Sequence, residues 1–208
     1  MQKKALIVDL DGTLYYQKPV QMCMAAEILL YYLLHFWRIK ELFLILAYRK
    51  KHNNEQIFDL LSFAKAQKAD VQFIEQLIQK WLFYKPLKWI KIFADKNLIK
   101  ILNIIKQKIP VVIYSDYKTE LKLKVLSFQP TFNFFYDGKD ILFLKPNPQG
   151  LSYIAQKLSL CAKDILVIGD RQDKDGLAAL AFGAEYLILP QNPIIRRKIL
   201  KKAVRALV

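Results

Sequence analysis

The chain has 208 residues, 54% of them hydrophobic, and a formal net charge of +15. This length and composition fit a compact globular protein, or one domain with a sizeable insertion. The two cysteines, Cys23 and Cys161, exclude a disulfide framework and fit free thiols in a reducing cytosol. No signal peptide is evident at the N-terminus, so we expect a cytoplasmic protein.

The positive charge is concentrated in two parts of the chain. Residues 15–100 carry fourteen basic and seven acidic residues. The tail after Pro190 carries six basic residues and no acid: Arg196, Arg197, Lys198, Lys201, Lys202 and Arg205. Such a charge favours anionic partners, whether phosphorylated metabolites, nucleic acid or an anionic membrane surface. The alternative is that the lysines form solvated helix faces without a partner.

An apolar run from Ala5 to Val8 predicts a buried strand near the N-terminus. Asp9 and Asp11 follow this strand, directly before Gly12. Side chains two residues apart on an extended chain point to the same face, so both carboxylates leave the strand on one side. Open α/β sheets bind their ligands at this end of the strands. Two acids that repel each other at such a place indicate a bound cation.

Residues 18–95 are predicted to be helical, beginning with one long helix over residues 20–50. Its stretch 22–37 is nearly all apolar, but its sixteen residues are fewer than the ~20 that a membrane span needs. One polar stripe follows this helix: Glu27, Tyr31, His35 and Arg38. The stripe favours a heavily buried helix over a membrane-associated one.

Two further helices are expected in the same part of the chain. The first covers residues 55–67 and is capped at Asn53-Asn54. The second covers residues 71–84, with Asp70 as its cap and Pro86 at its end. No catalytic cluster is evident among these helices, which indicates an inserted cap.

From about residue 97 onward, predicted strands alternate with predicted helices. The strands are expected over residues 109–114, 132–136, 165–168 and 185–189, and the helices over about 97–108, 118–126, 150–159, 176–182 and from 193. This alternation is typical of a doubly wound, mostly parallel, Rossmann-like α/β sheet. We therefore expect an α/β core of residues 1–17 and 96–208, with residues 18–95 as an inserted all-helical cap.

Polar residues follow the later strands in a recognisable order. They are Ser115 after the strand 109–114, Lys145 before Pro146, and Asp170 after the strand 165–168, with Asp173 and Asp175 behind it. Together with Asp9 and Asp11, this set resembles the four motifs of haloacid dehalogenase-like (HAD) phosphohydrolases, whose first motif reads DxDGT. The resemblance covers residues 4–15 and about 97–190.

The residue types themselves support phosphoryl transfer. A carboxylate can attack phosphorus and form an aspartyl-phosphate. An oxygen-bound divalent cation offsets the charge between nucleophile and phosphate. Asp9 and Asp170 are natural ligands for Mg²⁺, and no His or Cys cluster indicates zinc. Lys145 supplies positive charge, and Ser115 a hydroxyl and a backbone N–H, to the phosphoryl oxygens.

The resemblance implies a role for each residue. Asp9 matches the nucleophile of the family. Asp11 matches the general acid and base, which dehalogenase-like members lack, and its backbone carbonyl is a further Mg²⁺ ligand. The family places another acid four or five residues after the one that matches Asp170, where it orients metal-bound water. That spacing points to Asp175, and Asp173 is the alternative.

Asp116 stands where members of the family often carry an uncharged residue. With Ser115 and Lys145, it is a candidate for the phosphate-binding part of the site. It either adds negative charge there or caps the helix expected at residue 118, and the cap is the favoured interpretation.

The helical insertion resembles the C1 class of HAD caps, a lid that excludes water and contacts the leaving group. Its aromatic residues form the cap core, or line a pocket for an apolar or aromatic group such as a nucleotide or an isoprenoid. We expect Mg²⁺-dependent hydrolysis of a small phosphate monoester through an aspartyl-phosphate.

Two alternative functions remain. The first is a phosphotransferase or mutase that uses the same residues. The second is a peripheral protein that binds anionic membranes or nucleic acid through the basic tail. The expected partner is a small phosphorylated metabolite, with no specific nucleic acid and with weak association of the tail with anionic surfaces. The oligomeric state is left open.

Overall fold

A parallel β-sheet forms the centre of this computed structural model, which describes residues 3–207 and the side chains up to residue 200. The strands are β1 (Ala5–Val8), β2 (Val111–Ser115), β3 (Phe132–Phe135), β4 (Ile165–Gly169) and β5 (Glu185–Ile188). Their order is β3-β2-β1-β4-β5, and all neighbours are parallel. The predicted α/β sheet is confirmed, and the strand that leads to Asp9 lies at its centre.

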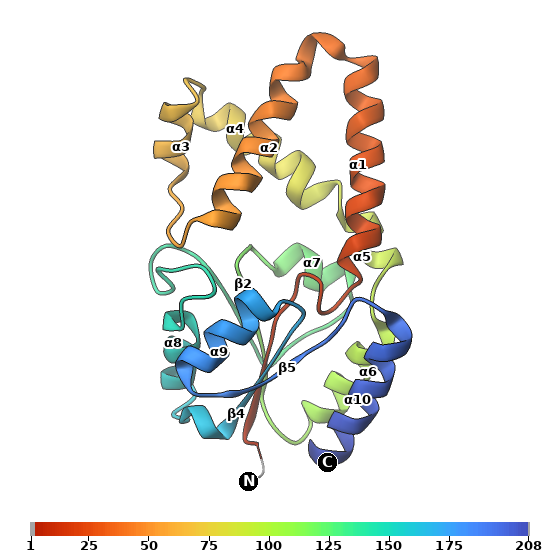
Figure 1. Ribbon diagram of the computed structural model, residues 1–208, viewed down its shortest axis with the longest axis vertical. Helices are drawn as coiled ribbons and strands as arrows, with labels where there is room; N and C mark the ends of the chain where they lie inside the picture. The colour runs from red at the N-terminus through yellow and green to blue at the C-terminus, as the bar shows by residue number, and fades with distance from the viewer. Residues whose placement is uncertain (1–2, 208) are drawn as a thin grey trace.

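Helices cover both faces of this sheet (Figure 1). One face is covered by α6 (Lys96–Ile105), α7 (Glu120–Val125) and α10 (Pro193–Leu207), and the other by α8 (Gln149–Lys157) and α9 (Leu177–Phe182). Leu6 and Val8 of β1 pack into the first layer, whereas Ile7 packs into the second. This alternation of apolar side chains on a fully buried strand is what a doubly wound sheet requires.

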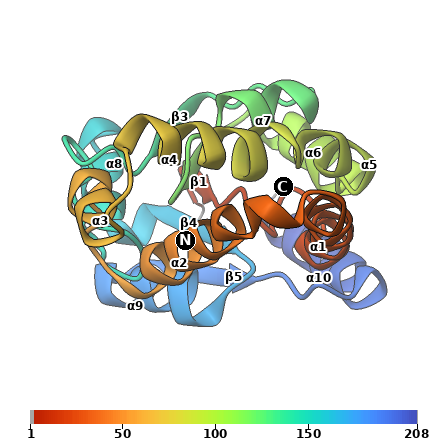
Figure 2. The ribbon, with the colours of Figure 1, turned by 90° about the horizontal axis from the view of Figure 1, so that it is seen from above.

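Helices also make up the segment between β1 and α6. They are α1 (Gln17–Leu34), the 3₁₀ turn η1 (Phe36–Arg38), α2 (Ile39–Asn54), α3 (Leu60–Ala66), α4 (Val71–Ile78), the π-helical turn η2 (Gln79–Tyr84) and α5 (Leu87–Ile92). Figure 1 shows this insertion standing above the carboxyl edge of the sheet, and Figure 2 shows α1, α2 and α4 from above. This position over the strand ends is the one that a cap needs.

The prediction of one helix over residues 20–50 is wrong, because the chain reverses at His35. There the backbone leaves helical geometry, with a φ of −127°. The His35 Nδ1 atom lies 2.8 Å from the carbonyl oxygen of Tyr31, so a side chain contacts the last turn of α1. After η1, the helix α2 runs back toward the core (Figure 1). The two helices therefore form a hairpin.

Of the two predicted helix caps, one is wrong and one is confirmed. Asn53-Asn54 does not cap a helix, because α2 continues to Asn54. Asp59 takes that role, and its carboxylate accepts hydrogen bonds from the N–H groups of Leu61 and Ser62 at 3.2 and 2.9 Å. Asp70 caps α4 as predicted. Asparagine and aspartate are similar cap residues, so spacing alone could not separate the two candidates.

The prediction that α1 is heavily buried is also wrong. Only Val20, Met24 and Tyr32 of this helix are buried. The polar stripe instead faces the interior of the cap, where Glu27 accepts a hydrogen bond from the Trp89 Nε1–H at 2.6 Å. None of the helices in the described part of the chain combines the length and hydropathy that crossing a bilayer takes.

Several contacts join the cap to the core. His52 of α2 stacks on Tyr117 of the core, with ring centroids 4.3 Å apart. The Tyr136 hydroxyl lies 3.0 Å from both the N–H and the carbonyl oxygen of Phe58. At the base of the cap, the Asp95 N–H donates to the carbonyl oxygen of Leu14 at 2.9 Å. The two chain segments that enter and leave the cap are thus paired with each other.

We predict that His52 makes the stability of the folded protein depend on pH. Burial, and then the positive charge of Lys174, lowers the pKa of His52 from 6.5 to about 4. Between these values the unfolded chain binds a proton that the folded protein does not, so the free energy of unfolding falls as the pH falls. The full loss is on the order of 3 kcal/mol.

Urea unfolding at about pH 7 and about pH 5 measures this effect. The His52→Phe variant loses this part of the pH dependence, and a matched change at the other histidine, His35→Phe, keeps it. An unchanged pH dependence in His52→Phe contradicts the assignment.

Candidate active site

The first two acids of the site leave the central strand β1. The Asp9 N–H donates to the carbonyl oxygen of Ile168 in β4 at 2.8 Å, which extends the sheet to this residue. Gly12 follows with a φ of +90°, and a Cβ there would lie 2.1 Å from Asp170 Oδ2. Only glycine therefore allows the turn after Asp11 to approach Asp170.

Lys145 links two carboxylates that follow different strands, β1 and β4. Its Nζ atom lies 2.5 Å from Asp9 Oδ1 and 2.7 Å from Asp175 Oδ1. Burial opposes the ammonium charge, but Asp175 and Asp9 outweigh that effect and raise the pKa of Lys145. The side chain therefore stays charged and connects β1 to the turn after β4.

Asp9, Asp170 and Asp175 form a cluster of carboxylates. Each offers one oxygen atom, and these atoms all lie within 4.8 Å of one another. Burial, and then the charge of Asp175, raises the pKa of Asp170 to about 6. Burial also raises the pKa of Asp9; Lys145 opposes this change, whereas Asp175 and Asp170 add to it.

This cluster fits a hard divalent cation. One lysine contacts two of the three acids, so the site carries an excess of negative charge in a buried place. Carboxylate oxygens are the ligands that Mg²⁺ prefers, and the described residues bring no histidine or cysteine into the cluster. A bound cation would relieve the repulsion that raises the pKa of Asp170.

The structure separates Asp175 from Asp173, which the sequence left as alternatives. Asp175 is buried in the π-helical turn η4 (Gln172–Gly176), and its Oδ2 accepts a hydrogen bond from the Arg171 N–H at 3.2 Å. Asp173 is exposed and forms an ion pair with Arg171. Asp175 thus contributes an oxygen to the carboxylate cluster itself, whereas Asp173 does not.

Asp116 does not cap a helix, so that interpretation is wrong. The N-cap residue of α7 is Thr119, and Asp116 lies three residues before it. The Asp116 Oδ1 atom instead accepts a hydrogen bond from the N–H of Lys145 at 3.0 Å. Its other oxygen lies 3.9 Å from Lys174 Nζ. Asp116 therefore holds the backbone of the residue that bridges the cluster.

Asp11 points away from the carboxylate cluster toward α7. Its oxygens lie 2.6 and 2.8 Å from Lys122 Nζ, and it accepts hydrogen bonds from the Tyr15 hydroxyl at 2.5 Å and from Ser115 Oγ at 3.3 Å. Burial raises the pKa of Asp11, but the attraction of Lys122 outweighs it and lowers the pKa overall. Asp11 is therefore held as a carboxylate, which can accept a proton.

Lys122 is a site residue that the sequence interpretation missed. Thr119, Lys122, Leu123 and Leu126 are all buried and follow the i, i+3, i+4, i+7 spacing of one helix face. A lysine at a core-facing position was the available signal, because buried lysines are rare unless they are paired.

Gln191 and Arg196 also belong to the site, although no pattern in the sequence indicated a role there for either. Gln191 Nε2 donates to Asp170 Oδ2 at 2.9 Å and to the carbonyl oxygen of Gly12 at 3.0 Å. Arg196, which the sequence interpretation counted with the basic tail, is buried and donates to the Thr13 carbonyl oxygen at 2.6 Å. Both side chains hold the loop of the first motif. The side chains of Lys201, Lys202 and Arg205 lie outside the described residues.

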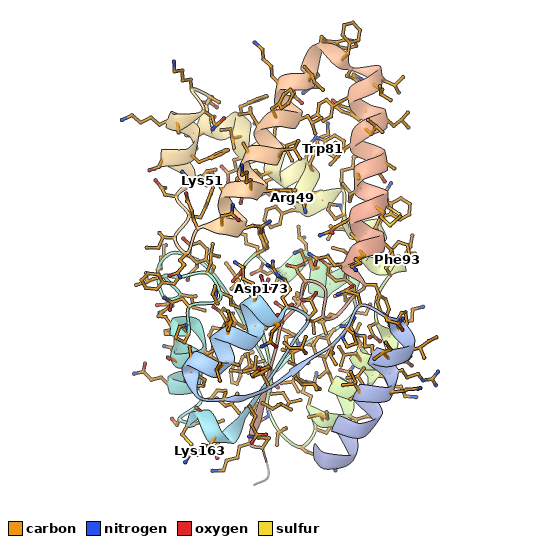
Figure 3. The ribbon with its side chains drawn as sticks, in the orientation of Figure 1. Arg49, Lys51, Trp81, Phe93, Lys163 and Asp173 are labelled. Atoms are coloured by element: carbon orange, nitrogen blue, oxygen red, sulfur yellow. The ribbon has the colours of Figure 1, made fainter. Side chains whose placement is uncertain are left out.

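A cavity of about 210 Å³ lies between this cluster and the cap. Its polar end includes Asp9, Asp11, Ser115, Lys145 and Asp170. Its other end is lined by apolar side chains of the cap: Val20, Met24, Ile28, Trp81, Leu82 and Ile90. Figure 3 shows Trp81 and Arg49, which also lines the cavity, on the cap side. The cavity thus joins a charged end to a cap side where apolar side chains stand beside a few polar ones: Gln17, Gln21, Arg49 and Asn53.

Comparisons with known proteins bear on the family and the fold of this chain. A family model described as haloacid dehalogenase-like hydrolase matches residues 3–183. A search of curated protein sequences finds no match.

Several solved structures share the fold. The Bacillus subtilis protein YfnB, solved with bound magnesium, is 15% identical, with 100% of this chain and 99% of that chain covered and a TM-score of 0.62. A HAD phosphatase from Thermococcus onnurineus is 20% identical, covers 91% and 87% of the two chains and has a TM-score of 0.61. A predicted phosphoglycolate phosphatase from Haemophilus somnus is 17% identical, with coverages of 91% and 86% and a TM-score of 0.57.

The separation of Asp175 from Asp173 leads to a test with matched variants. Asp175→Asn removes one charge from the cluster and should lower turnover of an aryl phosphate by about 10- to 100-fold, with a higher Mg²⁺ requirement. Asp173→Asn should leave both within about twofold, because that side chain is exposed. Steady-state rates over a Mg²⁺ titration measure both effects. Equal losses in the two variants would contradict the assignment.

The contact between Lys122 and Asp11 leads to a second test. Lys122→Met removes the charge that lowers the pKa of Asp11, so turnover should fall roughly 10- to 100-fold and the acidic limb of the pH–rate profile should move to higher pH. Lys124→Met, at an exposed position of the same helix, serves as the control. An unshifted pH profile in Lys122→Met would show that Lys122 does not set the charge of Asp11.

Proposed function

The chain belongs to the haloacid dehalogenase-like hydrolases, and we propose that within this family it is a Mg²⁺-dependent phosphatase of small phosphate monoesters. The observation that carries the proposal is the cluster of Asp9, Asp170 and Asp175 around Lys145, with Asp11 beside it. These are the groups that phosphoryl transfer to a carboxylate needs: a nucleophile, a cation site, a fixed positive charge and a base.

In the proposed mechanism, Asp9 is the nucleophile. Its carboxylate oxygen attacks phosphorus, the bond to the leaving-group oxygen breaks, and an aspartyl-phosphate forms. Lys145, held by Asp175, compensates negative charge beside Asp9, and Ser115 offers a hydroxyl to the phosphoryl oxygens. Mg²⁺ bound by Asp9, Asp170 and Asp175 would supply the charge neutralisation that brings two anions together.

Asp11 takes part in the proton transfer of both steps. In the second step, its carboxylate accepts a proton from the water that attacks phosphorus, which releases inorganic phosphate and restores Asp9. The contact with Lys122 favours this form of Asp11. In the first step the leaving-group oxygen needs a proton; Asp11 takes one from solvent when the contact with Lys122 is broken, and passes it to that oxygen.

The cavity supports a substrate with an apolar part next to its phosphate. The phosphate would lie among Asp9, Ser115 and Lys145, and the leaving group would point toward Met24 and Trp81 of the cap. Apolar walls with a small number of fixed polar groups are typical of sites for small molecules.

A cytoplasmic location and a cap over residues 18–95 are part of the same proposal.

Substitution of the nucleophile tests the proposed reaction. Asp9→Asn should lower phosphate release from an aryl phosphate by about 10³-fold or more, because asparagine cannot form the aspartyl-phosphate. The melting temperature should stay the same or rise, because the change removes one charge from a crowded buried cluster. Asp140→Asn, at an exposed position, is the control.

Chelation tests the metal, and product analysis tests the acceptor. EDTA should abolish turnover and added Mg²⁺ should restore it. Free inorganic phosphate should equal the alcohol released, whereas transfer to a second acceptor would identify a phosphotransferase or mutase. Full activity in Asp9→Asn, or in EDTA, would refute the proposed mechanism.

A further inference from the structure

The hairpin of α1, η1 and α2 exposes an unusually apolar surface. Its large exposed side chains, which we call the hairpin patch, are Met22, Leu29, Leu30, Leu33, Leu34, Phe36, Trp37, Ile39, Phe43 and Leu46. Their exposed fractions range from 40% at Ile39 to 73% at Met22. Single exposed apolar residues are common, but ten large ones on one helical hairpin mark an interaction surface.

The polar residues of the hairpin face the opposite way. Glu27 lies 2.6 Å from Lys88 Nζ and accepts a hydrogen bond from Trp89, inside the cap. Tyr31 and His35 stack on each other with centroids 4.4 Å apart, and Tyr31 packs against the buried Trp81. The hairpin therefore turns its polar stripe inward and its leucines outward, the reverse of a helix pair that faces only water.

The exposed charges of the hairpin are all positive. Its two acids are both paired within the cap, Glu27 with Lys88 and Glu41 with Arg38 at 2.6 Å. Lys18, Lys40 and Lys50 are exposed, and no carboxylate among the described residues lies within ion-pair distance of them. The hairpin itself thus offers exposed, unpaired positive charge, and each of its two acids has a partner.

The position of the hairpin gives a partner access to this surface. Its turn lies at the end of the molecule opposite the C-terminus, with α1 along the outside of the cap (Figure 1). Neither helix is long and apolar enough to cross a bilayer. An apolar face with aromatic residues and flanking lysines is typical of elements that lie in the interface of an anionic membrane.

We propose that the hairpin patch binds the surface of an anionic bilayer. Leu30, Leu33 and Trp37 enter the boundary between headgroups and acyl chains, and Lys40 and Lys50 contact lipid phosphates. A second copy of the chain is the less suitable partner, because it would bring together two proteins with a net charge of +15 each and like-charged patch borders. The proposal is independent of the phosphatase activity.

Vesicle co-sedimentation tests this proposal with the full chain. The protein should bind vesicles of phosphatidylglycerol and phosphatidylcholine, and should bind pure phosphatidylcholine more weakly, with affinity falling as salt rises. The triple variant Leu30→Gln, Leu33→Gln, Trp37→Gln should bind at least about tenfold more weakly, because three apolar side chains no longer enter the bilayer. Circular dichroism checks that the variant keeps its fold, since glutamine is a good helix former.

Two control variants locate the contact. Leu180→Gln changes an equally exposed leucine on the core, and Arg197→Gln with Lys198→Gln removes exposed charges of the basic tail. Both should bind vesicles like the unchanged protein. Brominated lipids should quench the fluorescence of Trp37, so quenching should fall in Trp37→Phe.

Three results would overturn the proposal. They are the absence of vesicle binding at low salt, binding that the tail variant loses and the hairpin variant keeps, and a dimer in sedimentation velocity that the hairpin variant abolishes without any vesicle binding. The last result would assign the patch to a second copy of the chain.

Discussion

The ion pairs of Lys145 with Asp9 and Asp175 are the interaction on which the rest of the site depends. They are buried, so the lysine is needed to compensate its two partners: loss of Lys145 would leave two unpaired buried carboxylates, which costs about 3–5 kcal/mol. Lys145 also keeps Asp9 and Asp175 close to Asp170 in spite of their mutual repulsion. One lysine does not balance three acids, and that residual negative charge is what makes the cluster suitable for a divalent cation.

The surrounding fold serves to bring these groups to one edge of the sheet. β1 and β4 are neighbours, so Asp9 and Asp170 leave adjacent strands in the same direction. The loop after Asp9 is held from the far end of the chain, where Gln191 and Arg196 donate to its carbonyl oxygens. Part of the basic tail therefore supports the site, although the sequence suggested either an external partner or a solvated helix face for its charge.

The sequence predicted the sheet well and the cap poorly, for a physical reason. β-branched runs that end in polar residues specify buried parallel strands, and the order of Asp9, Ser115, Lys145 and Asp170 predicted which strand ends meet. The hairpin could not be predicted in this way, because α1 is apolar on both sides and its polar stripe faces inward. Lys122 escaped notice because its partner, Asp11, lies far away in the sequence, and only the fold brings the two together.

The central claim is that Asp9 carries the phosphoryl group between the two steps of hydrolysis. Acid quenching of the enzyme during turnover, followed by peptide mass spectrometry, tests this claim most directly. One phosphoryl group is expected on the peptide that contains Asp9. With a nitrophenyl phosphate, whose leaving group departs without a proton, its level should rise when Asp11→Asn slows the second step. Turnover without any phosphorylated peptide, or with the phosphoryl group on another residue, would contradict it.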